Sequence, residues 1–173
     1  MIIDLKSVQD APRHFDFALQ PDWWHPEGED DQVLGMDGPL DVRITIYRAG
    51  TKHILEGRLS GTLRVRCDRC LEPCRHDLSK EFRLFLAPPP ATAESEIELE
   101  QEDLSLDFVV SDEVDLEEIV REQIYFSLPM KVLCKQNCLG LCPSCGANLN
   151  LEKCGCPKGE GHPEFSKLKS LKF

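Results

Sequence analysis

Alternating apolar and polar residues run through most of the first 110 positions, which predicts antiparallel β-strands. The longest alternating run, 55–65, places its leucines and Val65 on one face and its polar residues on the other. Gly57 and Gly61 interrupt the apolar face, which indicates bends in a curled sheet. Shorter runs of the same kind occur at 14–19, 40–47, 82–86 and 106–110. We therefore expect roughly five strands with one buried face, in an antiparallel sheet or a small barrel.

A helical periodicity replaces the alternation at 115–128. Asp115 occupies the position of an N-cap, and Glu118 three residues later completes a capping box. Pro129 ends the pattern. The apolar positions recur at helical spacing, at Leu116, Ile119, Val120, Ile124 and Leu128. We expect one helix that packs on the open face of the sheet, which makes the fold class α+β.

Between the last strands lies a segment that cannot continue the sheet. Pro88, Pro89 and Pro90 are consecutive, and proline is excluded from central strands. Twelve acidic and no basic residues follow between Glu94 and Glu118. Mutual repulsion favours a solvated loop at 88–103, and the alternative is an acidic arm that mimics or repels nucleic acid.

This acidic segment carries most of the net charge of the chain. The total is -11, but outside the segment 19 acidic residues stand against 20 basic ones. The net charge therefore does not exclude contact between the other surfaces and nucleic acid.

The composition changes after Pro129. Six of the nine cysteines lie between positions 130 and 160, where large aliphatic residues are scarce. The sequence thus predicts a β-rich domain at 1–129 and a cysteine-rich appendage at 130–173. The appendage ends in a short basic tail, 165–173.

The cysteines are expected to bind metal. The N-terminal residues lack the features of a signal peptide, and no apolar run approaches the roughly 20 residues of a membrane span, so we expect a cytoplasmic location. In a reducing compartment metal binding is favoured over disulfides. Eight cysteines form four close pairs and Cys74 is left over; the pairs are Cys67/Cys70, Cys134/Cys138, Cys142/Cys145 and Cys154/Cys156.

Zinc prefers four tetrahedral ligands, and two close pairs supply them. The strongest signal is Cys142-Pro143-Ser144-Cys145-Gly146, a zinc knuckle in which the glycine lets the backbone turn back toward the metal. The favoured arrangement has two zinc ions. One is bound by Cys142, Cys145, Cys154 and Cys156, the other by Cys67, Cys70, Cys134 and Cys138. The alternative is one site from Cys134, Cys138, Cys142 and Cys145.

The sequence does not predict an enzyme. A four-cysteine site has no open position for substrate, and the five histidines are scattered. A redox role for the 67–70 pair would require a helix after Cys70, where a strand pattern follows instead. No small-molecule substrate is evident.

Contact with RNA is the candidate activity of the basic residues. Arg64, Arg66, Arg69 and Arg75 surround the first cysteine pair, and Lys167, Lys169 and Lys172 lie in the tail. Acidic residues are interspersed among the arginines, so an ordinary solvated surface is the competing interpretation.

With these motifs in place, the chain resembles the YceD family, the large ribosomal RNA subunit accumulation proteins. Three pieces carry the resemblance: the Cys67–Leu71 turn after a long strand, the helix running into 128–131, and the pattern 133–150 followed by Cys154-Gly155-Cys156. The late 166–173 stretch also fits.

The resemblance implies a role in accumulation or processing of 23S ribosomal RNA, hence in large-subunit assembly. It implies no enzymatic activity and no catalytic residues. The expected partner is ribosomal RNA or a large-subunit ribosomal protein, with no membrane contact. The alternatives are an adaptor that binds a ribosomal protein without touching RNA, and a redox or zinc-handling protein.

Overall fold

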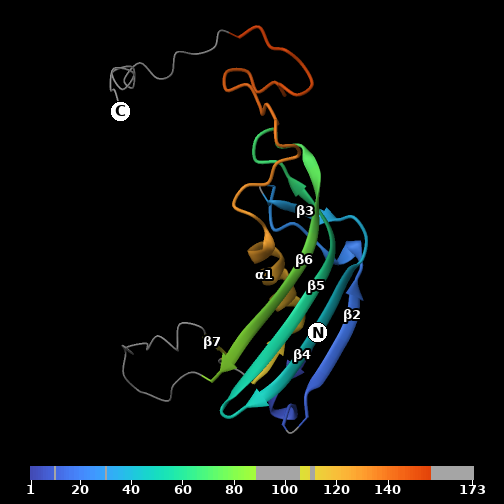
Figure 1. Cartoon of the computed structure of the whole chain (residues 1–173), viewed down its shortest axis with the longest axis vertical. Coiled ribbons are helices and arrows are strands. Elements are labelled where there is room, and N and C mark those ends of the chain that lie inside the picture. The colour runs from blue at the N-terminus through green and yellow to red at the C-terminus, as the bar shows by residue number, and fades with distance from the viewer. Residues whose placement is uncertain (10, 30, 89–105, 110–111, 157–173) are drawn as a thin grey trace, which may run out of the picture.

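A long twisted β-sheet carries one α-helix on one face (Figure 1). A cysteine-rich segment, described over residues 130–156 and called the extension below, lies beyond one end of the sheet (Figure 1). The computed structural model describes residues 1–9, 11–29, 31–88, 106–109 and 112–156. The strands are β1 (Ile2–Asp4), β2 (Arg13–Leu19), β3 (Val33–Met36), β4 (Leu40–Ala49), β5 (Lys52–Arg66), β6 (Pro73–Ala87), β7 (Leu106–Phe108) and β8 (Glu113–Asp115). The helix is α1 (Leu116–Ser127), and two short 3-10 turns occupy Leu5–Ser7 and Pro21–Trp23.

The main sheet has the strand order β2-β4-β5-β6-β7, with β3 paired to the far end of β5. The β4, β5 and β6 strands form two long antiparallel hairpins, and β7 alone joins in parallel, next to β6. β1 and β8 pair separately as a two-stranded sheet. The prediction of a mostly antiparallel sheet with one helix is confirmed. In the described part of the chain the strand order is an open path, so the sheet alternative applies and the small barrel does not.

The buried face of the sheet follows the predicted alternation. On β4 and β5 the apolar side chains, from Leu40 to Ile46 and from Leu55 to Val65, are almost fully buried. Gly57 has a specific role there, because its cross-strand partner Phe82 lies over it. A Cβ atom added at Gly57 would lie 2.2 Å from the Phe82 ring. The glycine therefore makes room for an aromatic ring in the core instead of only bending the strand.

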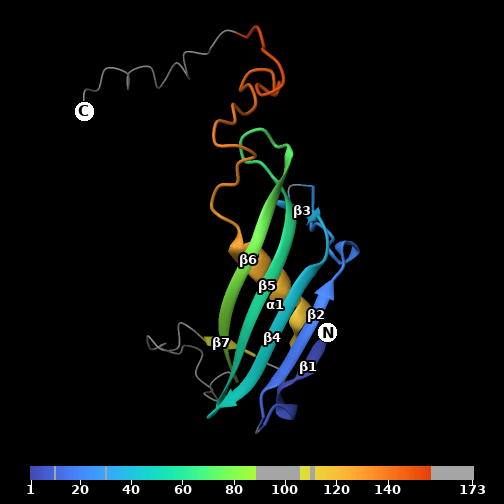
Figure 2. The same cartoon turned by 45° about the vertical axis from the view of Figure 1, so that its right-hand side comes forward.

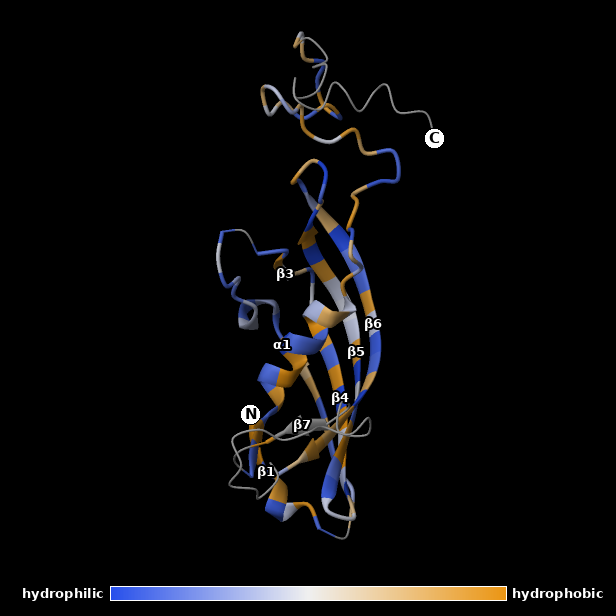
Figure 3. Ribbon diagram, turned by 90° about the vertical axis from the view of Figure 1, so that its left-hand side faces the viewer, coloured by the Kyte–Doolittle hydropathy of each residue, from blue (hydrophilic) through white to orange (hydrophobic). Residues whose placement is uncertain are grey.

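Helix α1 covers this buried face (Figures 2 and 3). It begins where predicted, because Asp115 accepts a hydrogen bond from the Glu117 N–H at 2.9 Å. Leu116, Val120 and Ile124 are fully buried, and Gln123 is also buried, which the apolar pattern did not reveal.

Loop 20–32 is tied to the outer side of the helix by aromatic contacts. The guanidinium of Arg121 stacks over Trp24, 4.5 Å from its ring centroid, and over Trp23 at 5.2 Å. The Tyr125 hydroxyl donates to Asp31 at 2.9 Å, and burial followed by this hydrogen bond raises the pKa of Tyr125 to about 12. Both tryptophans are thus used in packing.

The short strands were not predicted from the sequence. β1, β3 and β8 have three or four residues each, too few for an alternating pattern to stand out. The predicted acidic loop 88–103 lies outside the described residues except for Pro88, and so does the basic tail 165–173.

Candidate metal centre

Two cysteine turns have the same backbone structure. The first knuckle, Cys67–Leu71, follows β5, and the second knuckle, Cys142–Gly146, lies in the extension. In each, the residue after the second cysteine has a left-handed backbone, with φ of 62° at Leu71 and 74° at Gly146. Its N–H donates to the carbonyl of the first cysteine, at 2.9 Å in both knuckles. This turn brings the two thiols of each knuckle to one side of the chain.

The structure brings eight cysteine sulfurs together in two groups of four. We call Cys67, Cys70, Cys134 and Cys138 the first cluster, and Cys142, Cys145, Cys154 and Cys156 the second cluster. Within each cluster all four sulfur atoms lie within 4.8 Å of one another. This is the grouping of the favoured two-site arrangement. The alternative single site, made of Cys134, Cys138, Cys142 and Cys145, would have taken two cysteines from each of these clusters.

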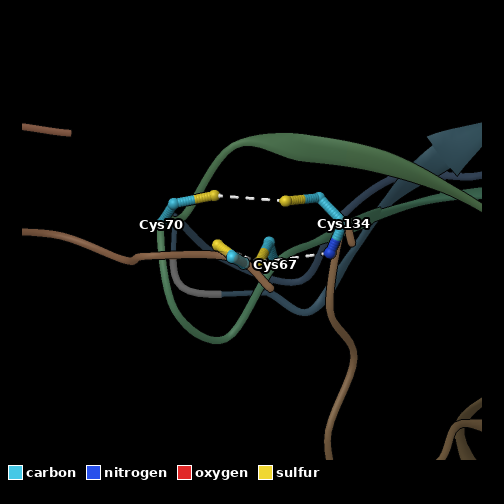
Figure 4. A group of neighbouring side chains, drawn as sticks. Cys67, Cys70 and Cys134 are labelled. Atoms are coloured by element: carbon cyan, nitrogen blue, oxygen red, sulfur yellow. Dashed lines mark hydrogen bonds between the residues drawn. The ribbon is translucent and has the colours of Figure 1, made fainter. Parts of the chain in front are cut away.

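The spacing of the sulfurs in the first cluster fits a tetrahedral metal site. The Sγ atoms of Cys67 and Cys138 are 3.9 Å apart. Those of Cys70 and Cys134, which point toward each other in Figure 4, are 3.7 Å apart. A tetrahedral site with metal–sulfur bonds of about 2.3 Å has sulfur–sulfur edges of about 3.8 Å. All nine cysteines are free thiols. Either cluster can therefore hold one metal ion, and four sulfur donors are consistent with zinc.

The first cluster is buried at the junction of the sheet and the extension. Cys67, Cys138 and Cys70 are 0%, 2% and 3% exposed, whereas Cys134 is exposed. Two of its cysteines come from the β5–β6 turn and two from the chain after α1, and Cys67 and Cys138 are 71 positions apart in sequence. A metal ion bound there would cross-link the end of the sheet to the extension.

Asp68, between the two cysteines of the first knuckle, fixes this junction. Its N–H donates to the Val132 carbonyl at 2.9 Å, and its carboxylate accepts from the Val132 N–H. The second carboxylate oxygen accepts from the Gln32 amide at 3.2 Å. One side chain thus joins the knuckle, the loop before β3 and the start of the extension.

Arg69, its neighbour, holds the second half of the cluster. Its guanidinium donates to the Cys138 carbonyl at 2.8 Å, and its own carbonyl accepts from the Leu141 N–H at 3.0 Å. Gly140 lies directly against it, with φ of 76°, and an added Cβ would approach the Arg69 carbonyl oxygen to 3.0 Å. Arg69 was predicted to contact RNA and no role was predicted for Asp68, although both stand inside a Cys-x-x-Cys motif.

Hydrogen bonds to sulfur prepare part of the first cluster to be thiolate. Burial alone would raise the pKa of Cys67, but backbone N–H groups of Cys134, Cys70 and Arg69 outweigh it and lower the pKa to about 6. Burial opposes the lowered pKa of Cys138 too, where the Asn150 amide and the Gly140 N–H are the stabilising donors. In the same cluster burial raises the pKa of Cys134 to about 12. Hydrogen bonding thus favours the thiolate form at Cys67 and Cys138.

The second cluster repeats this pattern in a more exposed place. Backbone N–H groups of Cys145 and Ser144 lower the pKa of Cys142 to about 6. A hydrogen bond with Cys145 and then burial raise the pKa of Cys156 to about 12. Cys142 is buried, Cys154 and Cys156 are partly buried and Cys145 is exposed. All four cysteines lie within 15 positions of sequence, so this cluster is local to the extension.

The arginines predicted to contact RNA have partners within the chain. Arg64 and Arg75 face each other across β5 and β6, and both lie near the Asp37 carboxylate, at 3.8 and 3.5 Å. The Arg66 guanidinium donates to the Glu29 carbonyl at 2.6 Å. Arg64 and Arg75 keep side-chain exposures of 50% and 71% and remain available to a ligand. Lys167, Lys169 and Lys172 lie outside the described residues.

The outer face of the sheet has a shallow hollow of about 590 Å³. Its charged residues are paired across the strands, Arg58 with Glu81 and Arg83 with Glu56. This balanced surface does not resemble a pocket for a charged small molecule. Among the described residues, no helix is long and apolar enough to cross a membrane. The predicted cytoplasmic location stays a prediction.

The fold and the clusters define a class: a twisted antiparallel sheet with one packed helix, extended by a segment in which two four-cysteine clusters can hold metal. The family model for the large ribosomal RNA subunit accumulation protein YceD matches residues 55–172, which include both clusters. The chain belongs to the YceD family. The name describes an accumulation factor, and no catalytic family is indicated.

Two curated relatives carry the name of this family. The chain is 28% identical over 177 residues to a Zea mays protein named large ribosomal RNA subunit accumulation protein YCED homolog 1, chloroplastic, covering 88% of this chain and 59% of the relative. The Arabidopsis thaliana protein of the same name is 26% identical, covering 78% and 49%. An uncharacterized protein of Mycobacterium tuberculosis is 32% identical, covering 65% and 52%. The chain spans about half the length of the curated relatives it matches. No solved structure matches it significantly.

Proposed function

We propose that this chain is a non-enzymatic factor for accumulation or processing of 23S ribosomal RNA and assembly of the large ribosomal subunit, stabilised by two structural zinc ions. The observation that carries the proposal is the family match over residues 55–172, which includes both knuckles. The relatives' names refer to accumulation of large-subunit ribosomal RNA.

The chemistry of the clusters supports a structural metal. Four thiols within 4.8 Å fill the coordination sphere of zinc, so no position is left for water or substrate. The backbone N–H groups that surround Cys67 and Cys142 are the donors that stabilise metal-bound thiolates. When bound, zinc would supply a cross-link at the first cluster and a local fold at the second.

Two measurements test this proposal. Elemental analysis of protein purified without added metal should give about two zinc ions per chain, since each site takes one ion. In cells that lack the gene, mature 23S RNA should fall relative to 16S RNA, and wild-type protein should restore it. Normal 23S levels without the protein would contradict the role in accumulation.

Direct contact with RNA is one way in which the factor would act. From residue 130 onward the sequence has seven lysines and three glutamates, so the extension is the basic part of an acidic chain. Binding through these lysines and through Arg64 and Arg75 must weaken steeply with salt. Measured affinity for 23S fragments should therefore fall linearly with salt on logarithmic axes.

A second candidate is an adaptor for a large-subunit ribosomal protein without RNA contact. The internal partners of Arg66 and Arg69 favour it, because these side chains hold the fold together. Salt-insensitive association with a ribosomal protein, together with no measurable RNA affinity, would select the adaptor over the RNA-binding factor.

A further inference from the structure

The loop of the second cluster contacts the first cluster. Residues 147–151 lie between Cys145 and Cys154, yet the side chain of Asn150 reaches out of this loop. Its Nδ2 donates to the Sγ of Cys138 at 3.3 Å, and its Oδ1 accepts from the Leu139 N–H at 2.9 Å. One asparagine from the second cluster's loop therefore supplies a hydrogen bond to a sulfur of the first cluster.

Asn150 is held in this position by its own loop. The Oδ1 of Asn148 accepts from the Asn150 N–H at 3.0 Å and from its Nδ2 at 2.9 Å. Asn148 also donates to the Glu72 carboxylate, next to the first knuckle, at 3.3 Å. The Leu149 N–H donates to the Gly140 carbonyl at 2.9 Å. The loop thus lies along the segment that joins Cys138 to Cys142.

The two ends of this loop lie next to two cysteines of the second cluster, Cys145 and Cys154. A metal ion bound to Cys145 and Cys154 would fix both ends and remove much of the loop's conformational freedom in advance. The first cluster would then gain the Asn150 hydrogen bond without the full entropic cost of ordering the loop. Hydrogen bonds of this kind to metal ligands typically change metal affinity by roughly 10- to 100-fold.

We propose that the two clusters bind metal cooperatively, with Asn150 as the positioning residue that couples them. The proposal rests on the proposed metal binding and adds a thermodynamic link between the two sites. Because such a link is reciprocal, loss of the first metal must weaken the second by the same factor as loss of the second weakens the first.

The test is a double-mutant cycle on the full chain, loaded with cadmium, which NMR resolves site by site. The first variant is Asn150→Ala. The second is Cys154→Ser/Cys156→Ser, which removes the second site and identifies the first-cluster resonance. The third combines both changes. The control is Glu152→Ala, which changes an exposed side chain in the same region. For each protein, the rate at which a chelator removes first-cluster cadmium is measured.

Cooperativity predicts that Asn150→Ala and Cys154→Ser/Cys156→Ser each accelerate cadmium loss from the first cluster by roughly 10- to 100-fold. The combined variant should lose cadmium no faster than the faster of the two, because both act through the same contact. Glu152→Ala should leave the rate unchanged. Unchanged tryptophan fluorescence in all variants would show that the sheet and helix remain folded around Trp24.

The outcomes separate this proposal from the one on which it rests. A wild-type chain that takes up no metal contradicts metal binding altogether. Two results in a chain that binds two ions would overturn the coupling and leave the two structural sites in place. One is a rate of cadmium loss from the first cluster that is unchanged in both variants. The other is a combined variant in which the two accelerations of cadmium loss multiply.

Discussion

The two knuckles share a backbone and differ in what surrounds them. Leu71 and Gly146 have nearly the same φ and the same 2.9 Å hydrogen bond. The first knuckle continues a 15-residue strand and is fixed by hydrogen bonds from its Asp68 to Gln32 and Val132, which lie outside the knuckle. The second is held by its own short segment. Local sequence therefore determines the shape of a cysteine turn, and the remote contacts determine how far its metal stabilises the rest of the protein.

The largest expected effect is the loss of the first cluster. Cys67→Ser should reduce metal content from two ions to one and destabilise the whole chain by more than about 4 kcal/mol, in the range of losses of buried metal sites. Elemental analysis and thermal unfolding measure both quantities. In Cys154→Ser one ion should also be lost, but the unfolding temperature of the sheet should fall less than in Cys67→Ser, because the first-cluster metal is weakened and not removed. Equal shifts in the two variants would contradict the difference between the clusters.

Acidification should weaken metal binding at both clusters. The pKa of Cys67 and of Cys142 is lowered from 9.0 to about 6, so the stabilisation from each thiolate is present above pH 9 and is lost as the pH falls through 6. In the first cluster the pKa is lowered at Cys67 and Cys138 and raised at Cys134 and Cys70, so metal binding there displaces about two protons.

The metal affinity of the first cluster should therefore fall about 100-fold per pH unit between pH 8 and pH 6. Cadmium NMR at a series of pH values would measure this slope. A slope of about tenfold per pH unit or less would contradict the release of two protons.

An intermediate effect is expected from removing the hydrogen bonds that the Asp68 side chain accepts. Asp68→Ala removes the acceptor of the Val132 N–H and of the Gln32 amide. Hydrogen bonds to charged groups contribute about 1.5–3 kcal/mol, so the free energy of unfolding should fall by about 2 kcal/mol. The first-cluster metal should also be lost faster to a chelator. Glu152→Ala, at an exposed acidic residue of the extension, is the control; a stability loss as large there would argue against a special role for Asp68.

The smallest expected effect on stability is at Leu71 and Gly146, the knuckle residues with a left-handed backbone. Leu71 adopts a conformation that costs non-glycine residues about 1–2 kcal/mol. Leu71→Gly should thus raise the free energy of unfolding by about 1 kcal/mol, and Gly146→Ala should lower it by a similar amount. Denaturant unfolding measures both. Leu151→Gly, at an exposed leucine without this backbone conformation, should bring no gain.

The sequence predicted the elements that have long periodic patterns. The strands around 40–47 and 55–65 and the helix after Asp115 are present because alternation and helical spacing over eight or more residues leave few alternatives. β7 pairs in parallel with β6, which no local pattern reveals. β1, β3 and β8 are too short to be recognised.

The cysteine spacing left two arrangements open, and the structure groups the sulfurs as in the favoured one. The residues that hold the clusters in place could not be read from spacing. Asp68, Asn148 and Asn150 act through partners that are 64, 76 and 12 positions away, and only the fold brings those partners close. Arg69 was predicted to contact RNA, which stays a prediction; its hydrogen bond to the Cys138 carbonyl, 69 positions away, could not be read from its charge.

The sequence separation within each cluster sets an order for assembly. The first cluster closes a loop of more than 60 residues, between Cys70 and Cys134, whereas the second needs only the segment 142–156. Closing a long loop costs more entropy, and here it also requires that the β5–β6 hairpin has formed and that α1 has docked. During folding the second cluster is therefore expected to form first, as an early local nucleus, and the first cluster to close last. Binding of a metal ion at the first cluster would then mark the moment at which the chain reaches its native topology.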